Sequence, residues 1–240
     1  MKNILITGCA KGLGLETSKM LAKAGYKVLG VSRTPTDDYE KVKLEHPNSV
    51  FFYQFDFYNV KGISALVKQI TKEHGRIFGL INNAAIGHDG VLATMHESDI
   101  SSLLKVNVEA PILLTKYVSR SMLLNRKGRI INVGSIIGST GFNGLSVYGA
   151  TKSALTGFTK SLARELGKSQ ITVNTLAPGY METNMTNGLI GDKLEKIKRR
   201  SCLGRLATIK DGASMMLYIL SEDAAGITGT TFTVDAGSTA

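Results

Sequence analysis

The stretch Asn3-Ile4-Leu5-Ile6-Thr7-Gly8-Cys9-Ala10-Lys11-Gly12-Leu13-Gly14 decides the fold prediction. Its first four residues predict a short buried strand, and the glycines after it follow the spacing Gly-x-x-x-Gly-x-Gly. Glycines in such a loop let the main chain approach a pyrophosphate, and the helix that follows offers free N–H groups and a positive dipole end. Glycine-rich loops also serve ordinary strand-to-helix turns, but the position after the first strand favours a nucleotide phosphate site.

The rest of the chain alternates between short apolar runs and longer helical patterns. Strands are predicted over residues 3–6, 27–31, 50–55, 77–81, 129–133, 171–176 and 230–234. Helices are predicted near residues 13–24, 61–74, 99–125, 148–166 and 208–221. Because the strand runs are apolar on both faces, helices should cover both sides of a parallel sheet. The sequence therefore predicts an α/β protein with a Rossmann-type, doubly wound, seven-stranded parallel sheet, folded as one domain over residues 1–240.

Composition and charge exclude several classes of protein. The chain has 240 residues, of which 43% are hydrophobic and 20% charged, as in ordinary globular proteins. The net charge of +10 favours an acidic partner, but the basic residues are spread along the chain, and the densest cluster, residues 193–200, is interrupted by Glu195. We therefore expect no nucleic-acid binding, and assign the positive field to an acidic protein or a phosphorylated cofactor.

Cysteine use and hydropathy indicate a cytoplasmic protein. Cys9 and Cys202 lie far apart and outside any Cys/His cluster, so neither a disulfide framework nor a metal site is expected. The N-terminal apolar run is too short for a signal peptide, and no segment approaches the ~20 apolar residues of a membrane span.

The end of the second predicted strand indicates which dinucleotide binds. Proteins that prefer NAD place a carboxylate there for the ribose 2′-hydroxyl, whereas this strand ends in Val31-Ser32-Arg33. Arg33 and Lys11 can instead meet a 2′-phosphate. The alternative is that both are solvated surface cations. The missing carboxylate favours NADP(H).

A second group of residues predicts the chemistry. Tyr148 and Lys152 are four residues apart and so share one face of a predicted helix, and Ser135 follows the fifth strand, at the edge where open α/β sheets bind ligands. A free tyrosine has a pKa of about 10, which a neighbouring ammonium lowers. Taken singly, the Tyr/Lys pair could be a surface pair and the serine a turn residue.

Together these motifs resemble the classical short-chain dehydrogenase/reductase family along the whole chain. The matching residues are Thr7-Gly8-x-x-x-Gly12-x-Gly14, Asp56, Asn82-Asn83-Ala84-Ala85, Asn107, Ser135, Tyr148-x-x-x-Lys152, and Pro178-Gly179 with Thr183. One departure is Ala85, where the family usually has glycine.

The resemblance implies roles for individual residues. Tyr148 would be the general acid in reduction, Lys152 would hold the ribose hydroxyls and lower the tyrosine pKa, Ser135 would polarise the substrate carbonyl, and Asn107 would order a water that feeds protons to Lys152. Asp56 and Phe57 would flank adenine, Asn83 and Ala84 would flank a ribose, and Pro178, Gly179, Met181 and Thr183 would frame the nicotinamide. The expected cofactor residues are Gly8, Lys11, Gly12, Leu13, Gly14, Ser32, Arg33, Asp56, Phe57, Asn83, Ala84, Ala85, Tyr148, Lys152, Pro178, Gly179, Met181 and Thr183.

Within the family, the chain resembles the 3-oxoacyl-[acyl-carrier-protein] reductases. The segments that carry this are residues 130–135, 171–183, 203–206 and 227–237. Departures are Ala236 in place of a glycine and the lack of a proline in Arg200-Ser201-Cys202. Alternatives are a reductase of a free ketone, a sugar or a polyketide intermediate, and, in another class, a non-catalytic regulatory protein that binds the cofactor. An intact Asn107, Ser135, Tyr148 and Lys152 set argues against the last.

The resemblance also implies an assembly, a lid and a partner. A homotetramer or homodimer is expected, with the helices near 99–125 and 148–166 packing across a dimer axis; the alternative is that their apolar residues only thicken the monomer core. Residues 182–201 should cover the substrate. An acidic acyl-carrier protein would dock on Arg126, with Lys168 beside the second expected docking position, Ser169; the alternative is that Arg126 is a solvated cation that ends a helix.

Overall fold

A computed structural model describes residues 1–181 and 198–240 of the chain. Seven parallel strands form one sheet in the order β3-β2-β1-β4-β5-β6-β7. The strands are β1 (Asn3–Thr7), β2 (Lys27–Ser32), β3 (Val50–Gln54), β4 (Ile77–Asn82), β5 (Gly128–Val133), β6 (Ile171–Pro178) and β7 (Thr231–Val234). This confirms the predicted doubly wound α/β fold.

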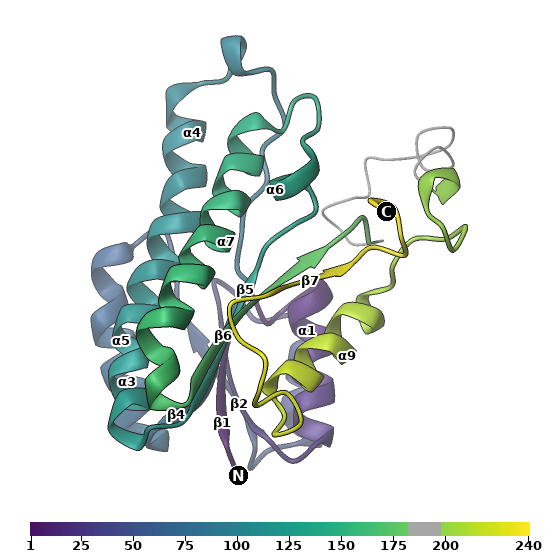
Figure 1. The fold of residues 1–240 in the computed structure, drawn as a ribbon. Helices are drawn as coiled ribbons and strands as arrows, with labels where there is room; N and C mark the ends of the chain where they lie inside the picture. Colours follow the sequence, from purple (N-terminus) through teal and green to yellow (C-terminus); the bar gives the residue numbers. More distant parts are fainter. Residues whose placement is uncertain (182–197) are drawn as a thin grey trace.

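Helices cover both faces of the sheet (Figure 1). The helices are α1 (Gly12–Lys23), α2 (Asp37–Glu45), α3 (Ile63–His74), α4 (Glu97–Leu104), α5 (Ala110–Asn125), α6 (Ile137–Thr140), α7 (Ser146–Leu166) and α9 (Ile209–Leu220). Short 3₁₀ turns are η1 (Val60–Gly62), η2 (Leu92–Thr94) and η4 (Gly167–Ser169), and η3 (Lys105–Glu109) is a π-helical segment.

Two apolar layers, one on each face of the sheet, form the core. Helices α3, α5 and α7 bury residues such as Ile70, Leu114 and Leu162 on one face. On the other face, α1, α2 and α9 contribute Leu21, Tyr39 and Ile219. Every residue of β1 and of β5 is buried, which explains why these runs are apolar on both faces. Over the described residues, no helix has the length and apolar character needed to cross a membrane.

Three elements differ from the sequence prediction. The helix expected over 99–125 is divided into α4 and α5 by the π-helical segment η3. Residues 37–45, where no helix was predicted, form α2, with Thr36 as its N-cap. β7 lies at the edge of the sheet, and its residues alternate between exposed and half-buried, because helices cover it less completely than the central strands.

Candidate active site

The glycine-rich loop lies between β1 and α1, and its glycines are required by the main-chain geometry. Gly8 and Gly12 have φ values of 67° and 51°, in the left-handed region that favours glycine. A Cβ on Gly14 would lie 2.2 Å from the carbonyl oxygen of Gly8. Lys11 is the N-cap of α1 and makes no side-chain cap bond, so the first N–H groups of the helix can face a ligand. The loop therefore fits a dinucleotide pyrophosphate, with Leu13 in the first turn.

Asn83 fastens the end of β4 to this loop. Its side-chain amide donates to the carbonyl oxygens of Thr7 at 2.9 Å and Gly8 at 3.1 Å. The Thr7 hydroxyl accepts from the main-chain N–H groups of Asn83 and Ala84. The amide N–H groups of Asn83 are thus committed to the fold, which leaves its carbonyl side and the main chain around Ala84 and Ala85 for the predicted ribose contact. The sequence analysis did not identify Thr7 as part of this junction.

The residues expected around the adenosine lie after β2 and β3. The side chains of Lys11 and Arg33 are exposed, and neither makes a hydrogen bond or ion pair within the part of the chain that the structure describes. Asp56 is exposed and accepts from the N–H of Tyr58 at 2.9 Å. The ring of Phe57 is packed in the core, edge-on to Phe55. Only the main chain of Phe57 can therefore contribute to an adenine site at this turn.

Ser135, Tyr148 and Lys152 converge beyond the carboxyl end of β5. Tyr148 and Lys152 lie on α7, and the side chain of Ser135 lies close enough to Tyr148 to act on its pKa. Ser135 Oγ accepts from the N–H of Ile137 at 3.2 Å. Lys152 Nζ lies 5.6 Å from the centroid of the Tyr148 ring and donates to the carbonyl oxygen of Val133 at 2.9 Å. The structure thus brings together three of the four predicted catalytic residues through a single strand and a single helix.

Burial sets the pKa values of this group. Burial raises the pKa of Tyr148, and the side chain of Ser135 partly opposes this effect, while Asp89 and Tyr180 raise the pKa further. Burial lowers the pKa of Lys152 to about 8. The expected lowering of the Tyr148 pKa by Lys152 is not found, and burial is the largest influence on this pKa. Asp89 and Tyr180 are neighbours of Tyr148 that the sequence analysis missed.

Asn107 lies in the π-helical segment and fixes the loop after β4. Its Oδ1 accepts from the N–H of Ile86, and its Nδ2 donates to the Ile86 carbonyl, both at 2.9 Å. Nδ2 also approaches the Thr151 hydroxyl at 3.3 Å, and that hydroxyl donates to the carbonyl oxygen of Tyr148. Asn107 therefore links this loop to the first turns of α7. Its predicted role in ordering a water stays a prediction.

The residues expected to frame the nicotinamide lie at the end of β6 and directly after it, next to the end of β7. The N–H of Gly179 donates to the Val234 carbonyl at 2.9 Å, and a Cβ on Gly179 would lie 2.5 Å from Cβ of Asp235. Pro178 ends β6, and Met181 is buried. Thr183 lies outside the described residues, as does most of the predicted lid.

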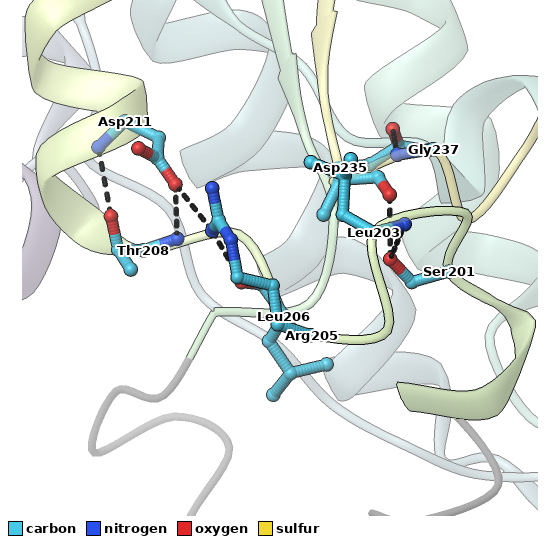
Figure 2. Close-up of polar contacts among 9 residues, drawn as sticks. Ser201, Leu203, Arg205, Leu206, Thr208, Asp211, Asp235 and Gly237 are labelled. Atoms are coloured by element: carbon cyan, nitrogen blue, oxygen red, sulfur yellow. Dashed lines mark hydrogen bonds and ion pairs between the residues drawn. The ribbon is translucent and has the colours of Figure 1, made fainter.

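Figure 2 shows how the chain continues after the undescribed segment. Ser201 Oγ donates to the Ala236 carbonyl at 2.5 Å and accepts from the N–H of Leu203. Ala236, where the resembled reductases have glycine, has a left-handed φ of 56°. Thr208 and Asp211 form a capping box that begins α9, and Arg205 pairs with Asp211 at 2.9 Å. Ser201 is therefore held against the chain that follows β7, at the edge of the sheet.

Arg126 and Lys168, the predicted docking residues, lie side by side but far from this site. Arg126 Nη2 donates to the Lys168 carbonyl oxygen at 3.0 Å, and both side chains are exposed. Arg126 precedes β5, whereas Ser135 follows it. A strand rises about 3.3 Å per residue, so roughly 20 Å or more separates the pair from Ser135.

A buried polar network below the site was also missed by the sequence analysis. Asn82 Nδ2 donates to Thr115 and to Asn132, Asn132 donates to Thr159, and Thr175 donates to the same Thr159 hydroxyl. Each of these distances is 2.8 or 2.9 Å. The network joins β4, β5 and β6 to α5 and α7 and so fixes the helix that carries Tyr148.

A doubly wound sheet with a phosphate loop after β1 and a Ser–Tyr–Lys group beyond β5 is the arrangement of a dinucleotide-dependent oxidoreductase. A profile of the short chain dehydrogenase family matches residues 2–193. The chain belongs to the short-chain dehydrogenase/reductase family.

Relatives and solved structures match over nearly the whole chain. It is 36% identical over 236 residues to the 3-oxoacyl-[acyl-carrier-protein] reductase FabG of Vibrio cholerae, covering 98% of this chain and 96% of that one. The enzyme of the same name from Escherichia coli K12 is 34% identical over equal coverage. The structure of ElxO with NADP bound has a TM-score of 0.90 at 30% identity, covering 99% of this chain and 98% of that one. A Serratia marcescens short-chain dehydrogenase/reductase mutant has a TM-score of 0.92 at 28% identity, covering 100% of this chain and 98% of that one.

Proposed function

We propose that this protein reduces a 3-oxoacyl thioester, such as a 3-oxoacyl-[acyl-carrier protein], to the 3-hydroxyacyl thioester with NADPH. The observation that carries the proposal is the convergence of Ser135 and Tyr148, with Lys152 one helical turn away. The similarity to 3-oxoacyl-[acyl-carrier-protein] reductases over 98% of the chain supports this substrate class. The two unpaired cysteines support a cytoplasmic location.

The mechanism divides proton and hydride between the two atoms of the carbonyl group. Tyr148 donates its phenolic proton to the carbonyl oxygen, and its raised pKa keeps that proton in place at neutral pH. Ser135 donates a hydrogen bond to the same oxygen. Lys152 uses one N–H on Val133 and has two left for the ribose hydroxyls. NADPH, when bound, supplies the hydride to the carbonyl carbon, which completes the alcohol.

The cofactor assignment rests on the glycine-rich loop and on two cations. The loop would hold the pyrophosphate, and the exposed side chains of Lys11 and Arg33 would hold the 2′-phosphate. The similarity to ElxO, solved with NADP bound, supports this choice. Wild-type kcat/KM should favour NADPH over NADH, and Arg33→Asp should narrow or reverse that ratio. Equal use of both cofactors by the wild type would contradict the assignment.

The activity is tested with acetoacetyl thioester and NADPH, beside a panel of free ketones and sugars. Tyr148→Phe should bind NADPH normally and lose about 10²–10⁴-fold in turnover, as removal of a general acid does. Preference for a free ketone or sugar would select the alternative enzyme. NADPH binding without turnover of any substrate would select the regulatory protein instead.

Docking of an acidic acyl-carrier protein on Arg126 and Lys168 is the remaining part of the proposal. Because this pair lies at the opposite end of β5 from Ser135, it would serve the site of another subunit in an oligomer. Arg126→Glu should slow turnover of carrier-bound substrate and spare a small thioester, and added salt should reduce the difference. An equal loss of turnover on the carrier-bound substrate and on the small thioester would indicate misfolding. Unchanged turnover on both would argue against docking.

A further inference from the structure

Two side chains, one at the end of β2 and one in the loop that follows it, hold a single residue of the glycine-rich loop. The N–H of Ala10 donates to Ser32 Oγ at 3.4 Å, and the carbonyl oxygen of Ala10 accepts from Thr36 Oγ1 at 2.7 Å. Both main-chain polar groups of Ala10 are thus bonded to the neighbouring loop. We call this pair of bonds the Ala10 clasp. It lies where β1 and β2 end, at the edge of the sheet that faces the cofactor.

Thr36 also connects the clasp to a fixed part of the fold. It is the N-cap of α2, and its Oγ1 accepts from the N–H of Tyr39 at 3.3 Å. Tyr39 is fully buried, and its hydroxyl donates to the Phe51 carbonyl of β3 at 3.0 Å. The hydroxyl of Thr36 therefore donates its proton to Ala10 and accepts a hydrogen bond from Tyr39. Because both bonds are directional, this hydroxyl sets the position of Ala10 relative to α2.

The clasp lies next to both cations proposed for the 2′-phosphate. Lys11 directly follows Ala10, and Arg33 directly follows Ser32. Each cation has a long side chain that is exposed and makes no hydrogen bond or ion pair with any described residue. The separation of the two cations therefore depends on how the two loops are held together. A ligand that bridges both cations is sensitive to that separation, whereas a ligand without a 2′-phosphate is not.

We propose that Thr36 is a positioning residue for NADPH selectivity, which acts by holding the glycine-rich loop against the loop that carries Arg33. This inference rests on the proposed use of Lys11 and Arg33 for the 2′-phosphate. Thr36 touches neither the phosphate nor the reacting atoms. The proposed effect of Thr36 is on the affinity for NADPH relative to NADH, and the proton transfer by Tyr148 is unchanged.

Thr36→Val tests the proposal, because valine keeps the shape of threonine and removes the hydroxyl. The dissociation constants of NADPH and NADH are measured by fluorescence titration. We expect that of NADPH to rise about tenfold, the effect of roughly one strong hydrogen bond, and that of NADH to change by less than about twofold. Thr36→Ser, which restores the hydroxyl, should restore the wild-type ratio. Ser32→Ala removes the other half of the clasp and should shift the ratio in the same direction.

Val42→Ala is the matched control, because it removes buried apolar atoms of α2 and loosens that helix without removing a hydrogen bond of the Ala10 clasp. It should lower the melting temperature and keep the NADPH to NADH ratio. An equal loss of selectivity in Val42→Ala, or an unchanged NADPH to NADH ratio in Thr36→Val and Ser32→Ala, would overturn the proposal. A wild type with no preference for NADPH would instead overturn the cofactor assignment beneath it.

Discussion

The buried ammonium of Lys152 and the phenol of Tyr148 have pKa values shifted in opposite directions by the same cause. Both side chains leave water, which disfavours the charged form of each. Tyr148 therefore keeps its proton well into the alkaline range, while Lys152 begins to lose its own near pH 8. The proposed general acid and its cationic neighbour are thus both in their working forms at neutral pH.

This predicts which residue limits reduction at alkaline pH. Turnover with NADPH should fall as the pH rises through about 8, because Lys152 loses its charge before Tyr148 loses its proton. In Lys152→Arg the residual turnover should lack this alkaline limb, since a guanidinium stays protonated. The pH dependence of kcat is the measurement. If kcat of the arginine variant still falls near pH 8, the alkaline fall belongs to a group other than Lys152.

The same burial predicts that Lys152 costs stability. Its folded pKa of about 8 lies below the ordinary lysine pKa of 10.5, so between these values the unfolded chain binds more protons and stability rises with pH. Lys152→Met removes the buried charge and should raise the free energy of unfolding by about 1–2 kcal/mol at pH 7. Urea unfolding at pH 7 and at pH 10 should show this gain shrinking at the higher pH. A variant less stable than the wild type at pH 7 would contradict the prediction.

Sequence spacing predicted the identity of these residues but not their electrostatics. The separation of Tyr148 and Lys152 by one helical turn is visible in the sequence, as is the position of Ser135 after a strand. The degree of burial depends on how α7 packs on β5 and β6. The expected direction of the tyrosine shift was therefore not found.

At the level of secondary structure, the π-helical segment η3 is what positions Asn107. A π-helical turn carries an extra residue relative to an α-helix and often occurs at functional sites. Here it lies between α4 and α5 and directs a buried side chain at the main chain of Ile86. The helical periodicity of residues 99–125 predicted one continuous helix, because a single extra residue hardly changes a hydrophobic pattern.

Removing the amide of Asn107 should destabilise the protein and slow turnover. Asn107→Ala leaves the N–H and the carbonyl of the half-buried Ile86 without their partners, at up to about 1–3 kcal/mol for each group. We expect a total loss of about 2–4 kcal/mol in urea unfolding. Asn107→Asp keeps the acceptor for the N–H of Ile86, so its free energy of unfolding should fall by less than that of the alanine variant. If the alanine variant is as stable as the wild type, the two hydrogen bonds between Asn107 and Ile86 do not contribute to the stability of the fold.

Helix α2 shows a second limit of sequence reasoning. It has nine residues, of which only Tyr39 and Val42 are buried, so its apolar stripe is too short to reveal a helical period. The start signal was nevertheless present, because Thr36 precedes Asp37, Asp38 and Glu40 in the first turn. The central strands β1, β4 and β5 were predictable because their nearly complete burial makes their sequences largely apolar. The polar contacts of the Ala10 clasp join separate loops and leave no local pattern.

For the whole molecule, the outer surfaces of α5 and α7 support the predicted oligomer. Ile112, Leu123 and Leu124 of α5 are exposed large hydrophobic residues. The exposed residues of α7 include the small Ala154 and Gly157, which would allow close approach of a second helix. Self-association through these helices stays a prediction.

Gly157→Gln should disrupt that association and leave the protomer intact. A Cβ at Gly157 meets nothing within 4 Å, and glutamine forms helices better than glycine. Light scattering after size-exclusion chromatography should show an oligomer for the wild type and a smaller species for the variant. Gly226→Gln, at another open position outside these helices, is the control and should keep the wild-type mass. A monomeric wild type at micromolar concentration would contradict the prediction.

The strand order of the sheet determines what a growing chain can build on the ribosome. β1 is made first but lies inside the sheet, between β2 and β4. A nascent chain that ends before β4 can pair β1 with β2 and β3, yet it leaves the other edge of β1 with unpaired main-chain groups, and such edges recruit other strands. It also lacks Asn83, which holds the carbonyl oxygens of Thr7 and Gly8. Pausing of translation before residue 83 would therefore expose the unpaired edge of β1 and a phosphate loop that Asn83 does not yet hold. The need for chaperones would be greatest while the chain is at this length.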